Sequence, residues 1–382
     1  MSKELFLKGI LFVLLILSGH SQADMLWDGG GDGYSWNDGD NWDPDNVPSS
    51  ADYARLNSGN TAIVHYGSRQ IKGLQVGYPL TNFSTSGTVN IEAGTSLGAE
   101  TIEIGPGTDG VSTVNVYGGT LTSSGSVGIG ANVAGVMGAG ILNVNNGGIC
   151  TFCTGGGLVR VPQNNSMFQE GVINIINGTV NVKEIEVGGW GPGTIYIGPN
   201  GVLNTDDRMY WNSDNTGRGR VFIDVNGGVW NAESAFDDAV INSYGHSTCN
   251  IRNGGMVITP QCIRVGRETG AADAVSQINI DGGTLNVGNE LQLGWRDNAG
   301  THNMSMISGE VNVSNDFCIG FADETYSHFQ FDGGIVNIGG NLKIGSDVND
   351  GMDMTGDAKL IVEGYDSIDA INNYIADGAL KA

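Results

Sequence analysis

Apolar and polar residues alternate in short runs of three to five along most of the chain, and the runs are separated by Gly-rich turns. The clearest copy is segment 278–287, Ile-Asn-Ile-Asp-Gly-Gly-Thr-Leu-Asn-Val, followed by Leu291–Gly294. The same order returns at 329–338, followed by Leu342–Gly345. Alternation with a period of two is typical of strands with one buried face. Each copy therefore predicts two short strands around a tight turn and a third strand after it.

The turn recurs at a nearly constant distance along the chain. Its last Gly stands at Gly94, Gly119, Gly148, Gly178, Gly201, Gly228, Gly255, Gly283, Gly309, Gly334 and Gly364, with steps that average 27 residues and range from 23 to 30. One such unit cannot cover its own apolar face, so neighbouring units must stack around a shared core. We therefore predict an all-β fold, a parallel β-helix (β-solenoid) of about eleven coils of ~27 residues, roughly 50 Å long at about 4.8 Å per coil. The alternatives are a β-propeller and a β-sandwich. A propeller blade needs about 40–45 residues, more than the 27 of this repeat, and a β-sandwich does not require a repeat at all, so the solenoid is favoured.

Asparagine recurs three residues after the turn Gly. The positions are Asn181, Asn204, Asn231, Asn286, Asn312 and Asn337. Amide side chains stacked in this way hydrogen-bond along the stack in cross-β structures. We expect a structural ladder, and the alternative is a polar face for a ligand.

The N-terminus has the pattern of a secretory signal peptide. Lys3 and Lys8 precede the apolar run 9–17, and Ser21 and Ala23 are small residues at the positions that a signal peptidase reads. We expect residues 1–23 to be removed, and the alternative is an uncleaved anchor. No later run approaches the ~18 apolar residues of a membrane span. The sequence therefore predicts a secreted or cell-surface protein without a membrane span after cleavage.

The two ends of the repeat region differ from its middle. Residues 24–80 contain Trp27, Trp36 and Trp42 among several Asp residues, and we expect an N-terminal cap module there. Residues 81–364 form the predicted solenoid. Residues 365–382 are expected to cap the last coil with a short helix whose Ile368, Ile371 and Ile375 share one face. An incomplete cap would permit end-to-end self-association of the rods.

At this point the chain resembles a known group of proteins. Trp27, Trp36, Asn41-Trp42, Val47-Pro48 and Asp52, followed by tandem Gly-Gly-x-Leu-x-Val coils, resemble large secreted β-solenoid proteins of environmental bacteria. These are related in architecture to pectate-lyase-like and autotransporter-passenger β-helices. The resemblance covers nearly all of the mature chain and implies the fold. It does not imply an activity, because this fold hosts lyases, hydrolases, adhesins and scaffolds.

The composition excludes several classes of protein. The 382 residues include 63 Gly and only 8 Pro, and charged residues make up 15%, which excludes collagen and a disordered chain. The net charge is −24, and removal of two Lys and one Glu with the signal peptide makes it −25. Such a chain repels phosphate backbones, so we expect no nucleic-acid partner. Five Cys remain, and Cys150-x-x-Cys153 has no second pair at metal-ligand spacing. We expect packed thiols or one local disulfide.

The segments after the third strands carry the candidate binding residues. Aromatic residues follow the strand-ending Gly or lie near it, and they form a column that consists of Trp190, Trp211, Trp295 and Phe321. Ring faces pack on the C–H faces of sugars, so this column predicts a glycan platform along the loop edge. Arg267 and Arg296 stand in equivalent loops, and guanidinium groups bind carboxylates and sulfates through paired donors. The alternatives are edge packing for the aromatic residues and ion pairs with Glu268 and Asp297 for the arginines.

Metal and catalytic signals are weaker. Asp40, Asp43 and Asp45 place oxygen ligands close together, so Ca²⁺ is a candidate ligand of the cap, although no cofactor is required. A lyase would need a base such as Arg267 near acids such as Asp297 or the pair 237–238. Hydrolysis needs two carboxyls about 5–9.5 Å apart, and the adjacent Asp206 and Asp207 are expected to point to opposite faces of a strand.

These observations give three functional hypotheses. The first is a secreted, non-catalytic, adhesin-like or structural β-solenoid that binds an extracellular polysaccharide along its loop edge. The second is a Ca²⁺-assisted polysaccharide lyase or a glycoside hydrolase. The third is a pure extracellular scaffold. The regular repeat favours the first and the third, because catalytic β-helices usually interrupt their repeat with long loops around one groove.

Overall fold

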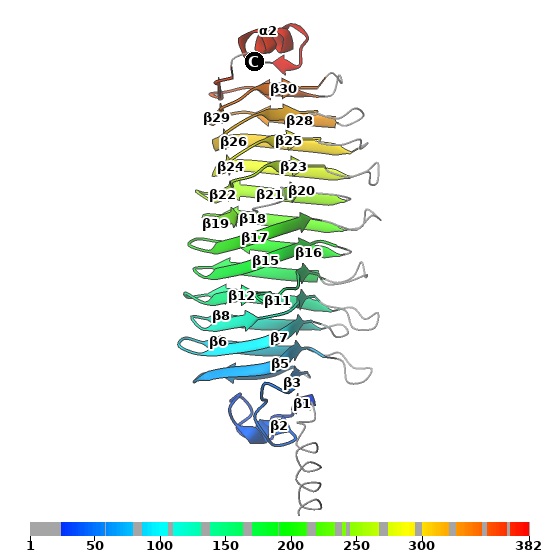
Figure 1. Cartoon of the computed structure of the whole chain (residues 1–382), viewed down its shortest axis with the longest axis vertical. Coiled ribbons are helices and arrows are strands. Elements are labelled where there is room, and N and C mark those ends of the chain that lie inside the picture. The colour runs from blue at the N-terminus through cyan, green and yellow to red at the C-terminus, as the bar shows by residue number, and fades with distance from the viewer. Residues whose placement is uncertain are drawn as a thin grey trace, which may run out of the picture.

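The computed structural model of the chain describes residues 24–57, 59–78, 86–105, 110–130, 138–162, 170–189, 191–211, 219–233, 239–241, 245–266, 274–294, 300–320, 326–345, 350–364 and 367–381. These residues form an all-β solenoid of about eleven turns, as the repeat predicted. Figure 1 shows the coils stacked into one rod, from the N-terminal end in blue to the C-terminal end in red.

Each coil contributes strands to three parallel sheets, which we call sheet I, sheet II and sheet III in chain order. Sheet I contains β4 (Asn60–Val64), β6 (Gly87–Glu92), β8 (Val111–Tyr117), β11 (Ala139–Asn145), β14 (Glu170–Ile176), β16 (Pro192–Ile197), β18 (Arg220–Asn226), β21 (His246–Arg252), the first halves of β24 (Val275–Val287) and β26 (Thr301–Val313), β28 (Tyr326–Phe331), β31 (Gly351–Met354) and β33 (Leu380–Lys381).

Sheet II follows the Gly turn. It contains the first halves of β5 (Ser68–Val76), β7 (Ser96–Ile104), β15 (Thr179–Val187) and β17 (Val202–Trp211), the second halves of β24 and β26, and β9 (Thr120–Ser123), β12 (Ile149–Phe152), β19 (Val229–Ala232), β22 (Met256–Thr259), β29 (Ile335–Ile338) and β32 (Lys359–Val362).

Sheet III completes the coil. It contains β1 (Asp24–Trp27), β3 (Tyr53–Leu56), the second halves of β5, β7, β15 and β17, and β10 (Val127–Ile129), β13 (Val159–Val161), β20 (Ala239–Ile241), β23 (Ile263–Val265), β25 (Leu291–Leu293), β27 (Phe317–Ile319) and β30 (Leu342–Ile344). β5 already pairs in parallel with β3 and β7, so the sheets run across the domain boundary expected at residue 80.

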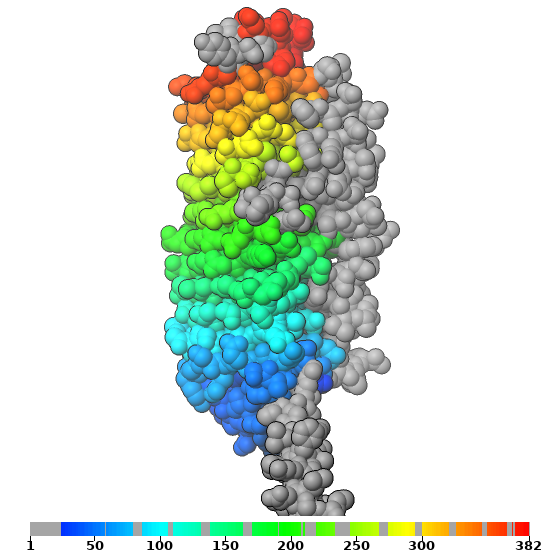
Figure 2. Space-filling view, in the orientation of Figure 1, coloured from blue at the N-terminus to red at the C-terminus, as the bar shows by residue number. Residues whose placement is uncertain are grey.

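Alternation within the strands produces the core. In β11, for example, Leu142 and Val144 are fully buried, while Asn143 between them is partly exposed. Equivalent positions stack directly, so Val144 pairs with Ile175 of the next coil and with Val116 of the previous one. The result is one continuous column of apolar side chains along the rod. Figure 2 shows the coils stacked in chain order, from blue at one end to red at the other. Burial of this shared column is the main stabilising contribution, because no single coil covers its own apolar face.

The turn between sheet I and sheet II needs two glycines for different reasons. Gly254 has a φ of +77°, in the left-handed region that favours glycine. Gly255 follows it, and a Cβ there would lie 2.1 Å from the carbonyl oxygen of Val225 in the previous coil. The first Gly therefore makes the turn, and the second lets successive coils approach at strand spacing.

The N-terminal cap is built on the three tryptophans that the sequence singled out. Trp27, Trp36 and Trp42 are buried to 1% exposure or less. The ring centroids of Trp27 and Trp42 are 5.0 Å apart, and those of Trp36 and Trp42 are 4.8 Å apart, both with edge-to-face geometry. Trp42 Nε1 also donates to the carbonyl oxygen of Trp36 over 3.0 Å. These rings close the first coils by covering the end of the apolar core.

The C-terminal end carries the expected short helix, α2 (Ser367–Ala376). Ile371 packs against the core together with Tyr374, as a capping face requires. Ile375, which was expected on the same face, is 53% exposed, so that detail of the prediction is wrong. No helix in the described ranges is long and apolar enough to cross a membrane.

Candidate functional site

The predicted asparagine ladder is confirmed on the outer face of sheet II. Asn204 donates to Asn181 over 2.7 Å, and Asn231 donates to Asn204 over 2.8 Å. Further along the rod, Asn312 donates to Asn286 over 2.8 Å and Asn337 donates to Asn312 over 2.7 Å. In each pair the amide Nδ2 of one coil reaches the Oδ1 of the preceding coil. The ladder therefore has a direction, with donors facing the N-terminal end.

A second ladder, which the sequence analysis missed, lies on sheet I. Asn115 donates to Asn90, Asn143 to Asn115 and Asn174 to Asn143, each over 2.8 Å, and Asn279 donates to Asn250 over 2.9 Å. Its signal was the Asn that stands between two apolar residues just before the turn in these coils. In the middle of this column Tyr196 and Asp224 replace Asn. Arg252 binds both oxygens of the buried Asp224 carboxylate over 2.8 and 2.7 Å.

Charged side chains gather on sheet III. Arg55 pairs with Asp24 over 2.7 Å, and Gln75 connects Arg55 to Glu103 through two further bonds of 2.7 Å. A groove of about 480 Å³ lies over Arg55, Gln75 and Glu103. Later in the same sheet Arg160 pairs with Glu186 over 3.0 Å. Opposite charges thus neutralise one another along this face.

The outer face of sheet II is different, because it carries no charge over seven consecutive coils. Its first outward column consists of Thr120, Ile149, Thr179, Val202, Val229, Met256 and Thr284, and its second of Thr122, Thr151, Asn181, Asn204, Asn231, Ile258 and Asn286. In a chain of net charge −24 this is a distinct surface. We call these fourteen residues the neutral face.

A groove on the neutral face lies where the amide ladder is interrupted. Ile258 stands in register between Asn231 and Asn286, so an apolar side chain replaces the expected Asn. The groove, of about 700 Å³, is lined by these three residues together with Asn312, Pro260 and the exposed Glu233. Its volume is within the range of about 300–1,000 Å³ that is usual for ligand sites.

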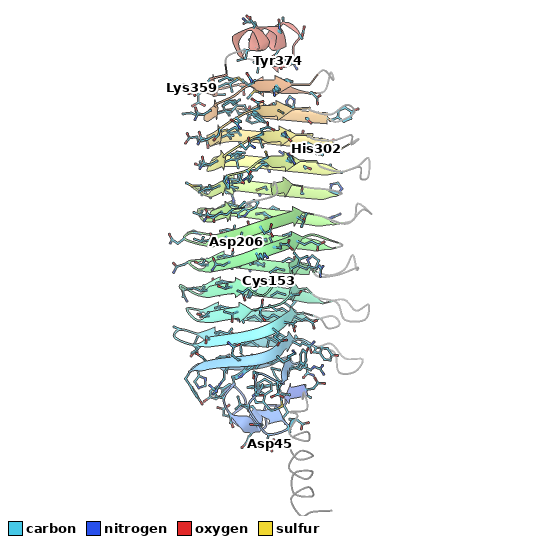
Figure 3. The ribbon with its side chains drawn as sticks, viewed as in Figure 1. Asp45, Cys153, Asp206, His302, Lys359 and Tyr374 are labelled. Carbon is cyan, nitrogen blue, oxygen red and sulfur yellow. The ribbon has the colours of Figure 1, made fainter. Side chains whose placement is uncertain are left out.

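A second groove continues along the same corner of the rod, where sheet II meets sheet III. It measures about 470 Å³, and its lining includes Lys183, Asp206 and Asp207. Asp206 and Asp207 were expected on opposite faces, but both line this groove. The reason is a bulge, since the register between β15 and β17 shifts where Lys183 opposes the two Asp residues. Figure 3 shows Asp206 above Cys153, which lines the same groove, near the middle of the rod.

The glycan platform predicted from the sequence cannot be placed in the structure. Trp190, Trp295, Phe321, Arg267 and Arg296 lie outside the described residues. Trp211 ends β17, but its side chain is not among those described. The loop-edge platform therefore stays a prediction.

The cap carboxylates proposed for Ca²⁺ are exposed at the N-terminal end of the rod, where Figure 3 labels Asp45. In the described part of the chain, Asp40, Asp43 and Asp45 do not belong to any group of three or more possible ligands around a metal position. A different carboxylate, Asp32, orders the cap loop through hydrogen bonds. Its Oδ1 accepts from the backbone N–H of Ser35 over 2.7 Å.

Asn41 completes this network. It donates to Asp32 over 2.7 Å and accepts from the backbone N–H of Gly33 over 2.8 Å. Desolvation pushes the pKa of Asp32 upward, but the hydrogen bonds from Ser35, Tyr34 and Asn41 outweigh it and hold the pKa below its usual range. The cap loop is thus ordered by hydrogen bonds to a carboxylate.

The buried titratable groups have the properties of structural residues. All five cysteines are buried and free, as thiols rather than disulfides. Burial raises the pKa of Cys249 and Cys318 to about 12. His302 is 1% exposed, its Nδ1 lies 3.1 Å from Ser276 Oγ, and burial lowers its pKa to about 4. The imidazole is therefore neutral in the folded protein at neutral pH.

No known protein family, curated protein or solved structure matches the chain. Its function is therefore argued from the residues themselves.

Proposed function

We propose that this protein is a secreted, non-catalytic β-solenoid that binds a neutral extracellular polysaccharide. The observation that carries the proposal is the neutral face, fourteen outward residues without charge on seven coils of a strongly acidic chain. The acidic chain as a whole repels an acidic polysaccharide, whereas it does not repel an uncharged one. The proposal places the main contact on sheet II.

The form of the rod supports binding of a polymer rather than of a small molecule. The two grooves follow one another along the corner of the rod from Thr151 to Asn312, which is six strand spacings or about 29 Å. A surface held in place by sheet hydrogen bonds does not have to order itself on binding. Repeated weak contacts along one polymer then add through effective concentration.

Secretion is part of the proposal and comes from residues 1–23, which have the sequence pattern of a signal peptide and lie outside the described residues. The likeness to bacterial pectate-lyase-like and autotransporter-passenger β-helices belongs here as well. It supports an extracellular or cell-surface location, and an adhesin-like role is one of the roles that this fold hosts.

A second candidate function is catalysis in the groove that contains Lys183, Asp206 and Asp207. Two carboxylates and an ammonium group in one groove of about 470 Å³ are residue types that a polysaccharide lyase or hydrolase uses. The bulge in β17 favours this alternative, because both Asp residues line the same groove. Bound Ca²⁺ would add to such a site.

Affinity electrophoresis tests the proposal. The mature chain is run through native gels cast with neutral or acidic polysaccharides, with and without Ca²⁺. Retardation in a neutral gel that still stains fully supports binding without cleavage. A cleared track establishes the catalytic alternative, and Asp206→Asn and Lys183→Met then show whether the second groove is responsible. Unchanged mobility throughout a broad panel contradicts both and favours a pure scaffold.

A further inference from the structure

The interruption of the sheet II ladder leaves two amide groups without partners. Asn231 donates to Asn204, and Asn312 donates to Asn286, so the ladder is intact on both sides of Ile258. Ile258 carries no polar atom in its side chain. Among the described residues, Asn231 Oδ1 accepts no hydrogen bond and Asn286 Nδ2 donates none. The groove of about 700 Å³ lies over this interruption.

The two unpaired groups define the chemistry of a ligand. Their residues are two strand spacings apart, about 9.6 Å along the rod, with one apolar side chain between them. The ligand must donate to Asn231 Oδ1 and accept from Asn286 Nδ2. A hydroxyl group does both, whereas a carboxylate only accepts and an ammonium group only donates. Between the two ends the ligand needs an apolar surface to pack on Ile258.

A pyranose ring has this combination, with hydroxyl groups around its rim and C–H groups on its faces. An extended peptide does not fit as well, because peptides usually add to the edge of a sheet and here the strands on both sides already pair. Glu233 and Pro260 also line this groove. The carboxylate accepts from a further hydroxyl, and the proline ring adds apolar contact.

We propose that the ladder gap at Ile258 is a subsite for one uncharged pyranose unit of the polysaccharide. Asn231 Oδ1 accepts from one hydroxyl, Asn286 Nδ2 donates to another, and Ile258 packs against the ring face. This inference rests on the proposed function and names the position on the neutral face where it is most specific. Coils on either side, where the amides satisfy each other, contribute only general contact.

Restoring the ladder tests the subsite. Ile258→Asn supplies a donor for Asn231 and an acceptor for Asn286, so the variant should be at least as stable as the parent to heat. Ile361→Asn is the matched control, because Ile361 continues the same column beside Asn337 and lies outside the groove. Both variants and the parent are titrated calorimetrically with cellohexaose, xylohexaose, mannohexaose and maltohexaose. We expect Ile258→Asn to weaken the best binder about tenfold or more and Ile361→Asn to leave it unchanged.

A second pair of variants keeps the test decisive if Ile258→Asn does not fold. Asn286→Asp keeps the acceptor for Asn312 but loses the free donor, so it should also weaken binding about tenfold. Asn90→Asp makes the same change at the first residue of the sheet I ladder, which accepts from Asn115, and should have no effect. A parent that binds while both groove variants bind equally well overturns the subsite and leaves the proposed function standing. A parent that binds no member of this panel or of the gel panel overturns both.

Discussion

Asn312 donates a hydrogen bond of 2.8 Å to Asn286, and Asn231 donates one of the same length to Asn204, yet Asn231 and Asn286 are not joined because Ile258 stands between them. The bonds join the amide side chains of successive coils. The interruption shows that the column is not required in every coil. The coil that departs from the pattern lies under a groove of about 700 Å³ on the neutral face.

The ladders predict a gradient of stability effects. Asn143 both donates to Asn115 and accepts from Asn174, so Asn143→Ala breaks two bonds and leaves Asn115 Oδ1 and Asn174 Nδ2 without their ladder partners. We expect a loss of about 1–3 kcal/mol in the free energy of unfolding, measured by denaturant titration. Asn90 takes part in only one ladder bond, so Asn90→Ala should cost clearly less. Equal effects would mean that the amide bonds contribute little.

The Asp224–Arg252 pair predicts a charge-specific effect. Arg252→Ala leaves the buried Asp224 carboxylate without its partner, and we expect a loss of about 1–3 kcal/mol, moderated by the 44% exposure of the Arg252 side chain. Arg252→Lys should recover only part of it, because an ammonium group cannot form the paired contact.

The double variant Asp224→Asn with Arg252→Ala isolates the cause. It should be more stable than Arg252→Ala alone, because no buried carboxylate is then left unpaired. Arg160→Ala, in the more exposed pair with Glu186, should cost less than Arg252→Ala. If the double variant is less stable than the single one, buried charge is not the reason for the effect.

His302 predicts a pH dependence of stability. Its pKa is lowered from 6.5 to about 4 in the folded protein, so the unfolded chain takes up the proton first as the pH falls. The neutral imidazole makes its full contribution to the free energy of unfolding above pH 6.5. This contribution is lost as the pH falls toward about 4, by about 3 kcal/mol in total. Denaturant titrations of the parent and of His302→Gln across this window isolate the contribution. The difference between them should change with pH, and a constant difference would contradict the account.

The cysteines should be chemically silent in the folded protein. Burial raises the pKa of Cys153 to about 11 and that of Cys249 and Cys318 to about 12, so little thiolate forms in mildly alkaline solution. We expect Ellman's reagent to detect almost no thiol in the native protein and five per chain after denaturation. Rapid reaction of the native protein, or fewer than five thiols after denaturation, would contradict this arrangement.

The architecture could be predicted from the sequence because the same residue types recur at equivalent positions of successive coils. The alternation around Gly282-Gly283 and Gly333-Gly334 predicted the strands, and the Asn column predicted the sheet II ladder. The reason for two Gly per turn could not be read locally, since Gly255 is needed for contact with Val225 of another coil.

The candidate site was less predictable. The absence of Asn at position 258 of the column was the available signal for the groove. Its consequence depends on Asn231 and Asn286 of the neighbouring coils, which lose a ladder partner, and this could not be read from position 258 alone. Asp206 and Asp207 were assigned to opposite faces by strict alternation, and a bulge against Lys183 placed both at one groove. The outward direction of Ile375 depended on how α2 docks, which the spacing of its isoleucines did not specify.

The most direct test of the account is hydroxyl-radical footprinting of the mature chain with and without a saturating neutral polysaccharide that retards it in gels. The account predicts protection of Met256 and its neighbours on the neutral face, with no change at Phe222 and Tyr326, which are 41% and 50% exposed on sheet I. Protection of the sheet I residues with none at Met256 would contradict the assignment of binding to the neutral face.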